Sequence, residues 1–217
     1  MSSGEFESRD SEGKPHFHDM YEYSWGQYIA RKNGLKAYNF SRGGMSAKWF
    51  IKSFADEKDF WNKDLACQAY VIALGANDQS SGIQIGDVED YKEPAKEIFC
   101  HYYGEIIRRY KEIQPRAKFF LVTMPRVDNK KIAARRAEFH KVYLEFADHF
   151  DNTYCIDLYK YAPVYNAEFD KQFKLYGHMN ASGYILTANM IDSYLNYIIR
   201  HNPEDFKRVG FIGNDLY

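Results

Sequence analysis

The sequence is poor in cysteine. Only three of its 217 residues are cysteines, Cys67, Cys100 and Cys155, and each lies among apolar neighbours. This context favours reduced, buried thiols over a disulfide framework. We therefore expect a cytoplasmic protein, with the proviso that a targeting segment would be lost together with any residues upstream of Met1.

The sequence also lacks an excess of charge and any long apolar run. Its 29 basic and 30 acidic residues give a net charge of −1, which provides no electrostatic footprint for nucleic acid. The basic clusters Arg108-Arg109, Lys130-Lys131 and Arg135-Arg136 fall on helical patterns, so we expect them on solvated helix faces. No run is long enough to span a bilayer. We expect neither a nucleic-acid nor a membrane partner, and the oligomeric state stays open.

What the sequence does contain is an alternation of strand-like and helix-like segments. Four apolar runs are typical of strands: residues 35–41, 69–75, 117–124 and 153–158. Helical spacing of apolar residues is found at 21–33, after Gly44, after Pro94, at 130–149 and in a closing segment that stops before Pro203. This alternation predicts parallel strands with right-handed crossovers. Residues 79–93, rich in glycine and serine, are expected to form a long loop.

The length fits a single core, and we expect one domain over residues 21–201, an irregular segment over 1–20 and a tail over 202–217. A strand should precede the helix at 21–33, yet residues 1–20 offer no buried strand. In the flavodoxin-like order 2-1-3-4-5, this missing strand would be central. Its loss would forfeit on the order of 10 kcal/mol of apolar burial. We therefore expect a fragment that begins at an internal Met, or else a different pairing upstream of residue 21.

Glycine and polar residues gather at the expected carboxyl ends of two strands, where ligands bind in open α/β sheets. Asn39-Phe-Ser-Arg-Gly43-Gly44 follows the run at 35–41, and Gly75-Ala-Asn77-Asp78 follows the run at 69–75. Gly177-His178-Met-Asn180 precedes the last helix. In order and spacing, from about residue 21 to residue 200, these segments resemble the SGNH (GDSL-type) hydrolases.

The resemblance implies a flavodoxin-like three-layer αβα sandwich with a parallel sheet. It also implies a serine esterase or acylhydrolase that acts on a small or carbohydrate-borne ester, with no metal or organic cofactor. In this family the Gly44 N–H and the Asn77 amide match the oxyanion donors, and His178 matches the general base. We place Gly43, Gly75 and Asp78 on the substrate side, and expect Asp78 to anchor its loop through backbone amides.

The family's nucleophile is not found in the sequence. No short apolar strand ends in Gly-Asp-Ser, and no such strand precedes Ser2 or Ser3. Ser41 and Ser46 are expected in turns or caps. A form without the nucleophile would be inactive, and a non-catalytic ligand-binding module on the same fold is the alternative function.

The family's acid is missing as well, because Leu175 stands where an Asp would precede the histidine. His178 would then act in a dyad, oriented by a backbone carbonyl, which we favour, or take a carboxylate from elsewhere. Asp170 is the nearest acid upstream.

Two further features have simpler explanations. His16, His18 and Asp19 could suggest a metal site, but histidines in a polar stretch are usually solvated, and we expect no metal. Most of the 19 Tyr and 16 Phe residues are expected in the core, although an aromatic side chain near the 79–93 loop could stack on a sugar ring.

Overall fold

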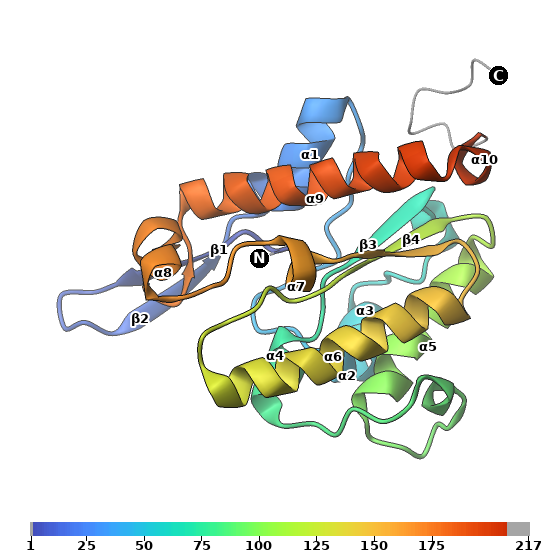
Figure 1. Ribbon diagram of the computed structural model, residues 1–217, viewed down its shortest axis with the longest axis horizontal. Coiled ribbons are helices and arrows are strands. Elements are labelled where there is room, and N and C mark those ends of the chain that lie inside the picture. Colours follow the sequence, from blue (N-terminus) through green and yellow to red (C-terminus); the bar gives the residue numbers. More distant parts are fainter. Residues whose placement is uncertain (1, 208–217) are drawn as a thin grey trace. The chain divides into compact units, whose positions relative to one another are not determined.

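The computed structural model describes residues 2–207 (Figure 1). The chain divides into two compact units. Unit 1 comprises Met1–Gly44 and Pro163–Tyr197, and unit 2 comprises Met45–Ala162 and Ile198–Tyr217. Each unit is therefore described by itself.

Unit 2 is built on a parallel sheet. Strands β3 (Ala69–Ile72), β4 (Lys118–Val122) and β5 (Thr153–Ile156) lie in the order β3-β4-β5, and both pairings are parallel. All five residues of β4 are buried, as is typical of the middle strand of a parallel sheet. The predicted α/β fold with parallel strands is thereby confirmed, and these strands lie within the ranges predicted for them.

Two long helices follow β3 and β4 in the chain, α5 (Phe99–Ile113) and α6 (Lys130–His149). The bounds of α6 match the prediction. The helix begins at Lys130 because Asn129 caps it by accepting a hydrogen bond from the Ile132 N–H at 3.1 Å. Both helices contribute large aromatic side chains to a fully buried core, among them Tyr103, Tyr143 and Phe146.

The other helices of unit 2 are short. They are α2 (Ala47–Trp49), a π-helical turn (Phe50–Phe54), α3 (Ala55–Glu57), α4 (Ala76–Ser81), α7 (Leu158–Tyr161), α10 (Pro203–Phe206) and two 3-10 turns (Lys63–Leu65 and Val88–Lys92). The predicted long loop at 79–93 is thus partly helical. Asp87 and Asp90 form a reciprocal capping box that organises the second 3-10 turn, and α5 begins at Phe99, later than Pro94.

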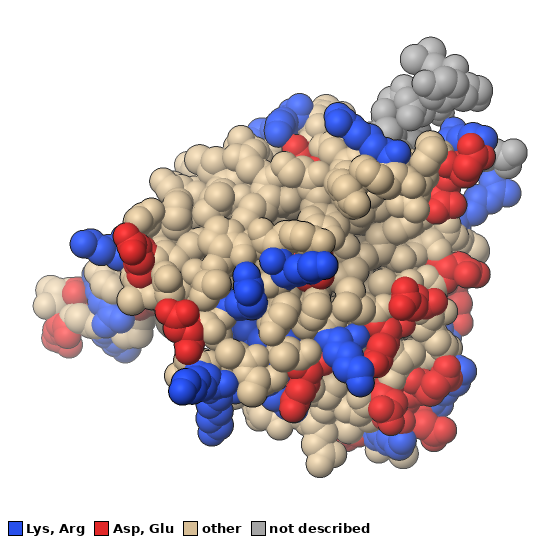
Figure 2. Space-filling view, in the orientation of Figure 1, with Lys and Arg blue, Asp and Glu red and all other residues tan. Residues whose placement is uncertain are grey.

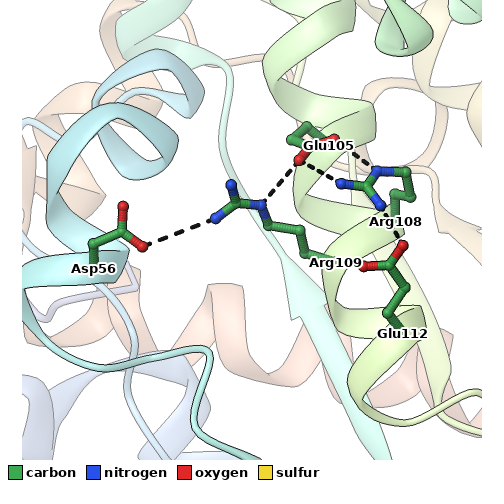
Figure 3. A network of polar contacts seen from close by, with 5 residues as sticks. All are labelled: Asp56, Glu105, Arg108, Arg109 and Glu112. Atoms are coloured by element: carbon green, nitrogen blue, oxygen red, sulfur yellow. Dashed lines mark hydrogen bonds and ion pairs between the residues drawn. The ribbon is translucent and has the colours of Figure 1, made fainter. Parts of the chain in front are cut away.

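The basic cluster on α5 lies among acidic side chains (Figure 3). Arg108 binds Glu105 at 2.7 Å and also pairs with Glu112, and Arg109 binds Glu105 at 2.9 Å. Asp56 of α3 lies 3.9 Å from Arg109. On the face shown in Figure 2, acidic and basic side chains are similarly interspersed. The basic cluster on α5 is thus neutralised by neighbouring carboxylates, and its arginines are half-exposed.

Unit 1 begins with an antiparallel hairpin of β1 (Glu5–Arg9) and β2 (Pro15–Asp19). A 3-10 turn (Tyr21–Tyr23) and α1 (Trp25–Asn33) follow, and Gly34 ends α1 in the left-handed conformation. The later elements are α8 (Ala167–Phe173), β6 (Lys174–Leu175), β7 (His178–Met179) and α9 (Ala181–His201), whose last turn belongs to unit 2. No helix in residues 2–207 is long and apolar enough to cross a membrane.

The prediction of a strand at residues 35–41 is wrong. In the flavodoxin-like order this segment would pair only with the first strand of the sheet. The described residues contain no such strand, so the segment forms no ladder. Residues 5–19, predicted to be irregular, instead form the hairpin. The alternative expectation, a different pairing upstream of residue 21, is therefore the one that the structure shows. The predicted tail contains α10, and its residues 208–217 lie outside the described residues.

Candidate active site

Gly75 shapes the turn between β3 and α4 in unit 2. Its φ of 124° lies in a region that residues with side chains rarely adopt. A Cβ atom at this position would lie 1.9 Å from the hydroxyl oxygen of Tyr143, which donates a hydrogen bond to the Leu74 carbonyl at 2.6 Å. Both the backbone conformation and the close approach of Tyr143 therefore require glycine here.

Asn77 lies in the first turn of α4 and is exposed. Its Nδ2 donates a hydrogen bond to the carbonyl of Met45, the residue that follows Gly44, at 2.9 Å. This bond fixes the orientation of the amide group. Because the amide carries two N–H groups, the second one is left as a donor in an orientation set by the first.

Asp78 points into unit 2 and is fully buried. Both of its carboxylate oxygens lie 3.0 Å from the Ala47 nitrogen, so the side chain holds the start of α2. Burial raises the pKa of Asp78, and the backbone N–H donors oppose that shift. The carboxylate of Asp78 thus holds the backbone at Ala47 from inside unit 2, and the place of Asp78 on the substrate side stays a prediction.

We expect Asp78→Ala to lower the free energy of unfolding by about 1–3 kcal/mol, because the buried Ala47 N–H loses its acceptor. Asp78→Asn is the matched control, since the amide oxygen can still accept that hydrogen bond. Urea denaturation of the three proteins measures the difference. Equal losses in the two variants would show that the hydrogen bond to Ala47 is not what the carboxylate contributes.

Gly43 and Gly44 end the first of the two stretches of chain that make up unit 1. The Gly43 N–H donates to the carboxylate of Asp19, with both oxygens at 3.1 Å. Gly44 has a φ of 72°, in the left-handed region that favours glycine, and a Cβ atom there would meet nothing within 4 Å. Gly44 is therefore required by the backbone conformation and not by crowding.

The two serines that flank these glycines have the local roles expected of them. Ser41 makes hydrogen bonds to the Asn39 side chain through its backbone N–H, at 3.0 Å, and through its hydroxyl. Ser46, in unit 2, caps α2 by accepting from the Trp49 N–H at 3.2 Å.

His178 opens β7 in unit 1, and each of its ring nitrogens faces a carboxylate of β1. Nδ1 lies 3.2 Å from Oε2 of Glu7, and Nε2 lies 3.1 Å from Oε2 of Glu5. The favoured prediction, a backbone carbonyl at the imidazole, is wrong. The carboxylate also does not come from Asp170, which binds Lys174 at 2.6 Å.

Glu7 is held from three sides. Oε2 accepts from the Gly177 N–H at 3.1 Å and faces His178, while Oε1 accepts from Arg9 at 3.0 Å. The Gly177 N–H, together with His178 and Arg9, holds the pKa of Glu7 below its usual value despite the opposing effect of burial. Its side chain is only 6% exposed. Glu7 is thus a fixed carboxylate anion.

Glu5 connects two of the predicted site residues within unit 1. Its carboxylate contacts His178, and a Cβ atom on Gly43 would lie 2.2 Å from its Oε1. Sequence reasoning missed both glutamates because residues 1–20 were not recognised as a hairpin. The signal was their spacing, since side chains two residues apart lie on the same face of a strand.

His16 and His18 have partners in the hairpin. His16 lies 3.1 Å from Asp10, and His18 lies 2.8 Å from the Ser8 hydroxyl. Within residues 2–207, no group of three or more His, Cys, Asp or Glu side chains is arranged to hold a metal ion. Cys100 and Cys155 are free thiols, and the Cys67 thiol donates a hydrogen bond to the Leu65 carbonyl at 3.3 Å.

The model of the GDSL-like lipase/acylhydrolase family matches residues 12–186. The chain belongs to this family. The resemblance found in the sequence is therefore confirmed, as is the α/β fold class. A search of curated proteins gave no match.

Several solved structures have a similar fold. One is 19% identical, with a TM-score of 0.58, over 88% of this chain and 91% of its own. A carbohydrate esterase of family 3 from Talaromyces cellulolyticus is 13% identical, with a TM-score of 0.51, over 82% of this chain and 92% of its own. An acetyl esterase mutant with an acetate ion is also 13% identical, with a TM-score of 0.50 over the same shares. At these identities, the likeness concerns the fold.

Proposed function

We propose that this GDSL-like protein carries the oxyanion and general-base residues of an ester hydrolase for a small or carbohydrate-borne ester. His178 is the base, and the Gly44 N–H and the Asn77 amide are the oxyanion donors. The single observation that supports this role best is the His178 ring, whose Nδ1 is held by a fixed carboxylate, as the base of a serine hydrolase requires. The carbohydrate esterase and acetyl esterase among the similar folds support the substrate class.

In this proposal, a serine hydroxyl attacks the ester carbonyl while His178 Nε2 takes its proton and later returns it to the leaving alcohol. The negative charge on the carbonyl oxygen is stabilised by N–H donors that are already oriented. Asn77 fits this requirement because its bond to Met45 fixes the amide before substrate binds.

We further propose that the nucleophile is not among these 217 residues, so that this form does not hydrolyse esters. The supporting observation is that Nε2 of His178 faces the carboxylate of Glu5, at 3.1 Å. In a serine hydrolase this nitrogen meets the nucleophilic hydroxyl. The same observation favours the second candidate, a non-catalytic module that binds a small ligand on the same fold.

A fluorophosphonate probe tests the proposal. We expect the 217-residue chain to remain unlabelled, because a base and oxyanion donors do not form a covalent bond without the nucleophile. An extended form, in which a short apolar strand ending in Gly-Asp-Ser precedes Met1, should be labelled at the new serine and should hydrolyse p-nitrophenyl acetate. Its serine-to-alanine variant is the matched control.

Two outcomes would contradict this proposal. Stoichiometric labelling of the 217-residue chain, mapped to Ser2 or Ser3 by peptide mass spectrometry, would show that the nucleophile is present after all. A folded extended form that neither reacts with the probe nor hydrolyses the ester would favour the non-catalytic module.

A further inference from the structure

The acid that orients His178 comes from an unexpected element. We infer that Glu7, on β1, is the positioning residue for His178 and takes the place of the acid that is absent at position 175. This inference rests on the proposed function, because an orienting acid matters only if His178 acts as a base. The role is assigned to Glu7 by the ring nitrogen that it faces and by the bonds that fix its carboxylate.

The two ring nitrogens of a catalytic histidine have different partners. Nδ1 donates to an acid that fixes the ring and its tautomer, and Nε2 exchanges a proton with the nucleophile. Glu7 lies at Nδ1, at 3.2 Å, and Glu5 lies at Nε2. Glu7 therefore occupies the position of the orienting acid, and Glu5 occupies the position of the nucleophile.

The surroundings of the two glutamates also differ. The carboxylate of Glu7 accepts from Gly177, the residue directly before His178, and from Arg9, so its position is set independently of the ring. The hydrogen bond to Gly177 further ties Glu7 to the turn that carries the histidine. The Glu5 side chain is more exposed, at 15% against 6%. Of the two glutamates, Glu7 is therefore the one whose carboxylate is held in place by hydrogen bonds other than that to His178.

The residue at position 175 lies beside His178 but cannot orient its ring. Leu175 pairs with His178 across β6 and β7, so a residue at 175 lies directly beside the histidine. Leu175 is 48% exposed, and its side chain offers no acceptor to Nδ1. The hairpin supplies that acceptor from β1. Phe17 of β2 packs its edge against the ring, with centroids 5.4 Å apart, which further restricts the ring's orientation.

The test is the tautomer of the neutral His178 ring, read from its ring ¹⁵N signals. In the 217-residue protein, the proton should be on Nδ1, because a charge-assisted hydrogen bond to Glu7 favours that form. In Glu7→Gln, the ratio of the Nδ1–H to the Nε2–H form should fall about tenfold or more. Glu5→Gln is the matched control, and it should keep the proton on Nδ1.

The rescue variant adds the missing acid where the family has it. Leu175→Asp in the Glu7→Gln background should return the proton to Nδ1, whereas Leu175→Asn should not. A merely structural role of Glu7 predicts no such return. Thermal melting confirms that each variant is folded before its tautomer is compared.

Three results would overturn the inference: a neutral His178 in the unmodified protein with its proton on Nε2, an unchanged ratio in folded Glu7→Gln, or an equal loss in Glu5→Gln. The first needs no variant, so the test holds even if Glu7→Gln does not fold. None of these measurements requires ester hydrolysis. A failure of the proposed function would instead appear as an extended form without activity while the tautomer follows Glu7.

Discussion

Replacing Gly75 by alanine is expected to lower the free energy of unfolding by about 3–5 kcal/mol. A φ of 124° costs about 1–3 kcal/mol for a residue with a side chain. The new methyl group would also lie 1.9 Å from the Tyr143 hydroxyl, and overpacking of this kind costs a further ~1–3 kcal/mol. Urea denaturation of the wild type and the variant measures the loss.

Two controls separate these causes. Gly44→Ala has only the conformational cost, about 1–2 kcal/mol, because its Cβ meets nothing within 4 Å. Tyr143→Phe should lose about 1 kcal/mol with its hydrogen bond to Leu74. The double variant Gly75→Ala with Tyr143→Phe should lose less than the sum of the single losses, because the clashing oxygen is gone. Strict additivity would show that the Tyr143 hydroxyl is not the obstacle.

The parts of the fold that could be predicted from the sequence are those determined by local pattern. The apolar run that contains β4 and the helical spacing at 130–149 required no knowledge of distant residues, and both elements lie where they were predicted. The segment at 35–41 also has a strand-like pattern but forms no strand. A strand also needs a partner, and the one required by the fold's order is not among the described residues.

The candidate site shows the same division. Gly75, Asn77 and Asp78 are contiguous, and their local geometry follows from the turn that they form. The partners of His178 could not be predicted in this way, because 171 residues separate His178 from Glu7. Glu5 and Glu7 reach the ring only because the polar segment 5–19 folds as a hairpin. A search limited to acids close to the histidine in sequence finds Asp170, which binds Lys174 instead.

Replacing Asn77 by alanine in the extended form is expected to lower kcat for p-nitrophenyl acetate by around 10²–10³, the usual cost of losing one oxyanion donor. The side chain is exposed and its amide is fixed by Met45, so the variant loses an oriented donor and little buried surface. The melting temperature should therefore change far less than kcat. His178→Ala should also lower kcat, by removing the base.

The matched control for Asn77 is Gln79→Ala, which removes another amide from α4, one that donates to the Ile132 carbonyl at 3.3 Å. Its kcat should equal that of the extended parent. Asn77→Asp keeps the shape of the side chain but replaces the donor with an anionic acceptor, so it should be at least as slow as Asn77→Ala. If Asn77→Ala keeps the parent's kcat, or if Gln79→Ala loses as much, the oxyanion is stabilised by other donors and Asn77 serves only to hold Met45.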